Sequence, residues 1–570
     1  MDYIKKLPGF RLLLTYKKGW LQSDIVAGIV LTTLLVPQGM AYAELAGLPA
    51  ITGLYTTVLC LVGYAIFGPS RILVLGPDSS LGPLIAATIL PIALSNGDPN
   101  QAIALASMLA VIVGLIMIFA GVAKLGFIAD LLSKPTRIGY MNGLALTILI
   151  GQLPKLFGFS TDADGLVNEA KAFVQGVMSG DTIVLALAIG LISIGIIIVL
   201  NRWMPKVPGI LVAVLIAIGL SSFFGLGDKG VSLVGSLPQG FPPFTIPHVS
   251  LADISLLFAG ALGIALVALT DTISTASAFA HKSGEQVKGN GEMIGIGAAN
   301  VAAGFFQGFP VSTSGSRTAV AEQAGAKTQL TGIVGAIFII LMLVFVPSLL
   351  SNLPQPTLAA VVIVASISLA DIPAMRRLWH QRKSEFMLAF VAFLGVALVG
   401  ILEGIAIAVL LSVLNIFRRA WWPYMARLGK VTGLAGHHDT KQYPKAKQVP
   451  GLIIFRFDAP LFFANCGTFR DRIRKYVINN PDVKWIIIAA EPITDIDTTA
   501  ADMLLELDAE LNKKDKYLVF AELKNSVRKK LVKYELIEPL ESKHFFPTIS
   551  SAVESFKKSN NVDWQEVPKK

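Results

Sequence analysis

Long apolar runs separated by short polar breaks make up most of the chain before about residue 430. The run Ile183–Leu200 contains no charged residue, and Leu330–Val346 and Met387–Leu402 share this property. A helix of about 20 apolar residues spans a hydrocarbon core of about 30 Å. Each of these runs therefore predicts a helix that crosses a membrane, and together they predict a multi-pass membrane protein.

The same pattern predicts fourteen spanning or half-spanning segments in this part of the chain. They lie near residues 23–45, 49–67, 78–93, 103–122, 138–154, 182–200, 208–224, 252–280, 291–308, 314–325, 329–348, 357–371, 385–400 and 402–418. An even number of crossings places both ends of the chain on the same side of the membrane. Trp421 and Trp422 follow the last segment and are typical of an anchor at the membrane interface.

Two of these segments are interrupted in similar ways, one in each half of the membrane part. Gly76–Ser80 (GPDSS) precedes the short apolar run Leu81–Ile92, and Gly308–Arg317 (GFPVSTSGSR) precedes Thr318–Gly325. Each break combines Gly and Pro with residues that cap the starts of helices. Unpaired backbone is tolerated at this depth only where it lines a cavity. Matching broken segments therefore indicate a transporter site near the middle of the bilayer.

The chain changes character after Lys430. Residues 432–450 are polar, and the region from Gly451 to Lys558 alternates apolar strand-like runs with amphipathic helices, which predicts a small α/β domain. The predicted strands are Leu452–Phe457, Trp485–Ala490 and Tyr517–Ala521, and the predicted helices are Gly467–Val477, Thr499–Lys513 and Lys524–Tyr534. We predict a transmembrane domain at 1–430, a linker at 431–450, the α/β domain at 451–558 and a tail at 559–570.

Composition and charge support this division. The chain is 54% hydrophobic and only 15% charged, which is too apolar for a soluble protein. Its net charge of +10 is concentrated between apolar segments, whereas the alternate loops Ser95–Gln101 and Leu350–Pro356 carry no basic residue. The basic residues concerned are Lys5, Lys6, Arg11, Lys17, Lys18, Lys134, Arg137, Arg202, Lys206, Arg376, Arg377, Arg382, Lys383, Arg418 and Arg419. This distribution predicts a cell-membrane protein with both termini in the cytoplasm. It does not fit a nucleic-acid partner, which would require a basic face with stacking aromatics.

The sequence offers no pattern for a metal, a cofactor or an enzyme. Cys60 and Cys466 lie in different parts of the chain and cannot form a disulfide framework or a metal cluster. The apolar part shows neither a nucleophile–base pair nor metal-ligand spacing. We therefore expect no catalytic residue, no metal site and no cofactor other than H⁺ or Na⁺ as a coupling ion.

The two helix starts after the breaks are the candidate anion site. An anion without its water needs groups of positive potential, and helix N-termini supply free N–H groups and the positive ends of dipoles. The candidate residues are Asp78, Ser79, Ser80, Ser314, Gly315, Ser316 and Arg317. Arg317 either faces the anion or pairs with an acid and holds helices together. Asp78 caps its helix, pairs with Arg317 or takes up a proton that travels with the substrate.

Two further helices carry candidate polar residues. Asp271 lies in an apolar helix with Ser274 and Thr275 on the same face, a cluster that either holds a proton or Na⁺ or forms an interhelix contact. Gln38 and Tyr42 are four residues apart on the first helix, and they either face the same cavity or pack against a neighbour.

The corner Asp495–Ala500 (DIDTTA) joins a predicted strand to a predicted helix in the α/β domain. Capping of the helix by Asp497 and Thr498 explains these residues. The alternative is a corner that is phosphorylated or binds a partner protein.

At these residues the chain resembles the SulP (sulfate permease) family of anion transporters. The matching stretches are VPQGMAYAELAGLP (Val36–Pro49), FGPSRILVLGPDSS (Phe67–Ser80) and GFPVSTSGSRTAVAEQAGAKTQLTG (Gly308–Gly332). The region from Gly451 onward resembles the STAS domain of these transporters. This domain is related to bacterial anti-sigma-factor antagonists, whose phosphorylated position corresponds to Thr499.

The resemblance implies two inverted seven-segment repeats, a core domain that moves against a gate domain, and an anion site between the third and tenth segments. It places Gln38, Tyr42, Ser316 and Arg317 at family site positions and implies a homodimer. Asp78 departs from members that have an aromatic residue or Thr there. Asp271 stands where many members have Glu and a sodium-coupled bicarbonate member has Asp, and Thr275 also matches that member.

The leading hypothesis is a secondary active symporter for sulfate, coupled to H⁺ or Na⁺, that works by alternating access. An exchanger of bicarbonate, chloride or dicarboxylates would use the same scaffold. Two alternatives belong to other classes: an anion channel or voltage-driven motor, and a membrane sensor in which the STAS domain signals to a cytoplasmic partner protein.

Overall fold

The computed structural model describes two compact units, Met1–Val413 and Leu414–Lys570, which are treated separately. The described residues are 8–9, 15–95, 101–126, 132–161, 163, 165–204, 207–283, 287–538, 540 and 544–564. The predicted basic residues Lys5, Lys6, Arg11 and Lys206, the loop positions 96–100 and the tail residues 565–570 lie outside them.

The first unit is helical. Among the described residues of the chain, seven helical segments that begin in this unit are long and apolar enough to cross a membrane: Lys18–Leu45, Ala50–Phe67, Gln101–Val122, Val184–Trp203, Leu251–Ala280, Gln355–Gln381 and Ile401–Trp421. Its longer helices are α2 (Leu21–Leu45), α3 (Ala50–Phe67), α4 (Gly82–Ser95), α5 (Gln101–Val122), α6 (Lys134–Phe157), α7 (Leu166–Ser179), α8 (Val184–Trp203), α9 (Gly209–Phe224), α10 (Leu251–Ser283), α11 (Gly289–Gly304), α12 (Gly315–Gln323), α13 (Leu330–Phe345), α15 (Gln355–Leu369), α16 (Ile372–Gln381), α17 (Lys383–Leu394) and α18 (Ile401–Trp421). The chain therefore has the predicted fold of a polytopic helical membrane protein.

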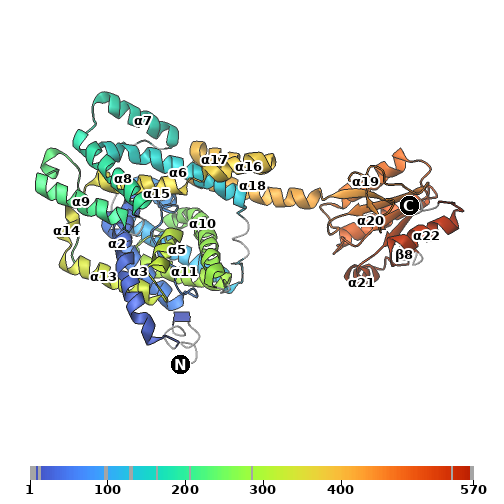
Figure 1. Ribbon diagram of the computed structural model, residues 1–570, viewed down its shortest axis with the longest axis horizontal. Coiled ribbons are helices and arrows are strands. Elements are labelled where there is room, and N and C mark those ends of the chain that lie inside the picture. The colour runs from blue at the N-terminus through green and yellow to red at the C-terminus, as the bar shows by residue number, and fades with distance from the viewer. Residues whose placement is uncertain are drawn as a thin grey trace. The chain divides into compact units, whose positions relative to one another are not determined.

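These helices pack in two groups that correspond to the expected core and gate domains. Helices α3, α5 and α11 lie side by side in the first group, which also contains α2, α4, α10, α12 and α13 (Figure 1). Helix α6 packs against α15 and α17 in the second group, together with α7, α8, α9 and α16. Small residues allow close contact in the first group: a Cβ on Gly297 of α11 would lie 2.6 Å from the carbonyl oxygen of Gly114 on α5.

The two broken segments meet in the first group. Strand β1 (Leu75–Gly76) precedes α4 and pairs antiparallel with β2 (Ser312–Thr313), which precedes α12. In this pairing Leu75 lies opposite Thr313 and Gly76 opposite Ser312. The two short strands therefore bring the starts of two short helices, one from each half of the sequence, to the same place.

The second unit contains a six-stranded sheet in the order β4-β3-β5-β6-β7-β8. Its strands are β3 (Met425–Gly429), β4 (His438–Asp439), β5 (Leu452–Phe457), β6 (Trp485–Ala489), β7 (Tyr517–Ala521) and β8 (Phe545–Phe546), and its helices are α19 (Cys466–Asn479), α20 (Thr498–Asn512), α21 (Asn525–Lys533) and α22 (Ile549–Ser559). Strands β5 to β8 are parallel, and β3 pairs antiparallel with both of its neighbours. Helices α19, α20 and α21 cover one face of the sheet and α22 covers the other.

The structure confirms the three predicted strands and three predicted helices of this domain within a few residues. It differs at the domain boundary, because β3 and β4 belong to the sheet although they precede the predicted start at Gly451. These strands are short and interrupted by polar residues such as Arg427 and His438, so the apolar pattern does not distinguish them from a linker. The amphipathic helices α7 and α16 were not predicted for the same reason: neither contains a long apolar run.

Candidate functional site

A cavity of about 730 Å³ lies at the starts of α4 and α12. Its lining includes nine of the residues predicted from the sequence: Tyr42, Asp78, Ser79, Ser80, Asp271, Thr275, Ser314, Gly315 and Ser316. Four separate elements contribute them: α2, the turn before α4, α10 and the start of α12. The residues that were selected by type are thus brought together in one polar cavity.

Both helix starts are capped at this cavity. The Asp78 carboxylate accepts a hydrogen bond from the Ser80 backbone N–H at 2.9 Å, and the Asp78 carbonyl accepts from the backbone N–H groups of Leu81 and Gly82. At the second start, the Ser314 side chain accepts from the backbone N–H of Arg317 at 3.5 Å. The positive ends of the α4 and α12 dipoles therefore point toward the same space.

Arg317 lies behind the cavity wall and not in the cavity. Its side chain is 1% exposed, and its guanidinium nitrogen Nη2 lies 3.5 Å from Asp78 Oδ2 and donates to the Pro77 carbonyl at 2.5 Å. A Cβ at Gly76 would collide with Nη1, so only glycine leaves room for this guanidinium. Nε and Nη1 have no hydrogen-bond partner among the described residues. Of the two alternatives for Arg317, the structure therefore favours the one in which it pairs with an acid. The pair also explains how a site for anions can contain the acidic residue Asp78.

Ser80 connects the two acids of the cavity. Its hydroxyl oxygen lies 2.7 Å from Asp78 Oδ1 and 3.1 Å from Asp271 Oδ2. A serine hydroxyl has one proton to donate. It cannot satisfy two ionised carboxylates at once, whereas a proton on one of them would complete the chain of hydrogen bonds. The arrangement is therefore suited to hold one additional proton.

Helix α10 contributes a polar face to the cavity. Asp271, Ser274 and Thr275 all line it, as expected for residues three and four positions apart on a helix. A Cβ on Gly315 would lie 3.9 Å from Thr275 Oγ1, which shows how closely α10 approaches the start of α12. Oxygen atoms from both helices thus face the same space.

The two candidates on α2 differ in their positions. Tyr42 lines the cavity, and so does Ser79. Gln38 lies one turn earlier, is 8% exposed and is not among the described residues that line the cavity. In this conformation Tyr42 faces the cavity, whereas the position of Gln38 agrees with the alternative that it packs against a neighbour.

Sequence reasoning did not assign Arg137, Met141 or Ser368 to the site, although all three line the cavity. Arg137 and Met141 are one turn apart on α6, and Ser368 lies near the end of α15. Arg137 was noted only as one of the basic residues between apolar segments. The sequence did offer a signal for Arg137, because a basic residue in the first turn of a spanning helix can face either the membrane surface or the interior of the helix bundle.

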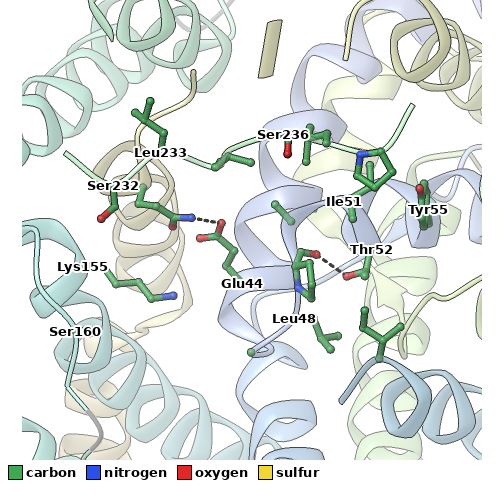
Figure 2. A pocket seen from close by; sticks show the side chains of 18 of the residues that line it. Glu44, Leu48, Ile51, Thr52, Tyr55, Lys155, Ser160, Ser232, Leu233 and Ser236 are labelled. Carbon is green, nitrogen blue, oxygen red and sulfur yellow. Dashed lines mark hydrogen bonds between the residues drawn. The ribbon is translucent and has the colours of Figure 1, made fainter. Parts of the chain in front are cut away.

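A second cavity of about 980 Å³ lies beside the last turn of α2 and at the other end of α6 (Figure 2). Glu44 lines it and accepts a hydrogen bond from Gln355 Nε2 at 2.8 Å, and Lys155 extends toward Glu44. None of its described lining residues lines the first cavity. The last turns of α2 therefore separate the two cavities, with Tyr42 on one side and Glu44 on the other.

The predicted corner of the second unit is a capped helix start. Asp497 caps α20 by accepting from the Ala500 N–H at 2.8 Å, and its second oxygen accepts from the Phe463 N–H at 2.8 Å. This confirms capping by Asp497, but Thr498 is the first residue of the helix and not its cap. Thr498 and Thr499 are exposed. A hydrogen bond from Lys530 holds the pKa of nearby Asp495 below its usual value.

A helical membrane unit with two broken segments that meet at a polar cavity defines a membrane transport protein. The sulfate permease family model matches residues 21–392, and the STAS domain model matches residues 443–552. The chain belongs to the sulfate permease family, and its second unit contains a STAS domain.

Individual relatives and solved structures agree. The chain is 39% identical to "Probable sulfate transporter Rv1739c" of Mycobacterium tuberculosis, over 97% of this chain and 98% of that protein. Its fold matches murine Slc26a9, an anion transporter in the inward-facing state, with a TM-score of 0.90 and 24% identity over 98% and 95% of the two chains. The transmembrane domain of the cyanobacterial bicarbonate transporter BicA matches with a TM-score of 0.60 and 20% identity, over 70% of this chain and 98% of that domain.

Proposed function

We propose that the chain is a secondary active transporter that carries a small inorganic anion, sulfate, across the cell membrane by alternating access. The observation that carries the proposal is the cavity at the starts of α4 and α12, where two helix N-termini point at one space. The similarity to a probable sulfate transporter over nearly the whole chain supports sulfate as the substrate.

We propose that H⁺ is the coupling ion and that Asp78 and Asp271 share the proton. The support is the single Ser80 hydroxyl between two carboxylates, which one additional proton would complete. Na⁺ is the second candidate, because Asp271, Ser274 and Thr275 offer three side-chain oxygens on one face of α10.

We further propose that both termini lie in the cytoplasm and that the first cavity opens to that side. Arg137 in the first turn of α6 and Asp371, the N-cap of α16, line the cavity beside basic segments that the positive-inside rule assigns to the cytoplasm. A homodimer and a partner protein for the STAS domain, both suggested by the family, are part of this proposal.

Uptake of radiolabelled sulfate into proteoliposomes tests the proposal. The purified full-length protein is reconstituted, and an inward proton gradient and an inward sodium gradient are imposed in separate experiments, with bicarbonate as competitor. We expect accumulation driven by the proton gradient. Accumulation driven only by sodium would replace the coupling ion, and uptake of bicarbonate or a dicarboxylate without sulfate would replace the substrate and favour an exchanger. Currents that do not saturate and need no gradient coupling would indicate a channel.

A further inference from the structure

Helix α6 places a basic side chain in each of the two cavities. Arg137, in its first turn, lines the cavity of Asp78, and Lys155, in its last turn, lines the cavity of Glu44. At 1.5 Å per residue these positions are about 27 Å apart, which is close to the thickness of a hydrocarbon core. One helix of the second group therefore carries a cation at each end of the transport path.

The two cations have different surroundings. Lys155 extends toward the Glu44 carboxyl group (Figure 2), so its cavity contains an acid that faces it. The Arg137 guanidinium forms no hydrogen bond or ion pair with the described residues, and it interacts with Asp271 only electrostatically. Its hydrogen-bond donors are therefore available to a ligand in the first cavity.

Arg137 is also the one basic residue among the described residues that line the first cavity. Asp78, Asp271 and Asp371 line it as well, whereas Arg317 is buried behind the wall and engaged by Pro77 and Asp78. An anion that enters this cavity meets three acids, two helix N-termini and the single guanidinium of half-buried Arg137. Without Arg137, the full charges facing the anion would all be negative.

We propose that Arg137 is the cationic contact for the transported anion and binds it from the side opposite the α4 and α12 starts. The planar guanidinium presents paired N–H groups that match two oxygens of a tetrahedral oxyanion. Because α6 belongs to one helix group and α4 and α12 to the other, an anion held between them touches both groups at once. This inference deepens the proposed function and rests on it.

Substitution of Arg137 tests the inference, and substitution of Lys134 serves as the matched control. Lys134 lies in the same first turn of α6 but is exposed and does not line the cavity. The variants R137Q, R137K and K134Q of the full chain are compared in sulfate binding to the purified protein and in the KM and kcat of uptake. We expect R137Q to weaken binding and raise KM about tenfold or more, since charge-assisted hydrogen bonds are lost. We expect R137K to lie between R137Q and the wild type, and K134Q to stay within about twofold of the wild type.

The outcomes separate this inference from the proposed function. If the wild type binds and transports sulfate and R137Q has the same KM, the inference is overturned and the function stands. If R137Q and K134Q change KM equally, the effect belongs to the surface charge and the inference is again overturned. If the wild type transports bicarbonate and not sulfate, the proposed substrate is overturned, and a bicarbonate KM that R137Q leaves unchanged would overturn the inference as well. A loss of folding in R137Q would appear in thermal unfolding, and R137K, which keeps the charge, then decides by its KM.

Discussion

The guanidinium of Arg317 lies 3.5 Å from the carboxylate of Asp78, and this ion pair joins the starts of two short helices that come from opposite halves of the sequence. Asp78 would otherwise place an uncompensated negative charge at a site for anions. Arg317 balances this charge from behind the cavity wall, and the carboxylate oxygens of Asp78 remain available for helix capping and hydrogen bonding. Arg317 thus shapes the site without entering it.

Arg317→Ala is expected to abolish transport and to lower stability by about 3 kcal/mol. Removing one member of a buried ion pair leaves the other charge without a partner, which is more destabilising than removing both. Thermal unfolding of the purified protein and sulfate uptake measure the two effects.

The double variant Asp78→Asn/Arg317→Gln is the control. We expect it to be more stable than the variant Arg317→Gln alone, because it leaves no isolated charge. Strictly additive stability changes in this double-mutant cycle would show that the pair is not coupled.

The sequence predicted the membrane segments and the two broken helices well, because both signals are local. Apolar length alone identifies a spanning run such as α8, and Gly76-Pro77 or Gly308 with Pro310 marks a break regardless of the rest of the fold. The strand β3 and the amphipathic helices α7 and α16 were missed, because their apolar residues are few and are completed only by distant partners.

The candidate site was predictable by residue type but not by geometry. Asp78 and Asp271 were chosen as polar residues in apolar surroundings, and both line the cavity. The Ser80 bridge between them depends on the approach of α10 to the turn before α4. The orientation of Arg317 away from the cavity depends on the β1–β2 pairing. Neither contact can be predicted from the sequence alone. Arg137 was missed because one basic residue at a helix start is normally explained by the membrane surface.

Asp271→Asn is expected to remove the pH dependence of sulfate uptake. In the wild type we expect faster uptake as the pH falls on the side from which sulfate enters, because a proton on one acid completes the hydrogen bonds through Ser80. An Asn amide supplies the donor permanently and cannot titrate. Initial rates across a pH series in proteoliposomes measure the effect, and Asp78→Asn is compared in the same series.

Ser274→Ala is the matched control for proton coupling. Ser274 lines the same cavity on the same helix as Asp271 but is not the bridge between the acids. We expect its pH profile to match the wild type. If Asp271→Asn and Asp78→Asn both keep the wild-type pH profile, proton coupling is excluded, and a loss of sodium stimulation in Ser274→Ala or Thr275→Val would assign the site to Na⁺.

Thr499→Glu and Thr499→Ala are expected to differ in transport rate if the STAS corner is regulatory. Thr499 is exposed in the first turn of α20, where a negative charge is favourable to the helix. The Glu variant should therefore fold normally and mimic phosphorylation. Asp497→Ala serves as the structural control, because loss of this cap lowers stability by about 1 kcal/mol. Equal uptake by both Thr499 variants and the wild type would leave capping as the whole role of the corner.

Gln355→Leu is expected to expose the first cavity to the opposite side of the membrane. The hydrogen bond from Gln355 to Glu44 joins α15 of the second helix group to α2 of the first, beside the second cavity (Figure 2). Alternating access requires these groups to move apart on that side, so this bond must break in each cycle. Losing a hydrogen bond to a charged group weakens the present conformation by about 2 kcal/mol, which favours the alternative one.

Thiol labelling of Ser316→Cys measures this change, since Ser316 is exposed in the first cavity and both native cysteines are buried. A membrane-impermeant reagent is added on the side of the second cavity, and the labelling rate is compared with and without Gln355→Leu. We expect an increase of roughly thirtyfold, the change in population that about 2 kcal/mol produces. Gln307→Leu, which alters the same cavity without touching Glu44, should leave the rate unchanged. An unchanged rate in Gln355→Leu would show that the Glu44 bond does not hold this side closed, because a contact that restrains the movement must affect the population of the two conformations when it is removed.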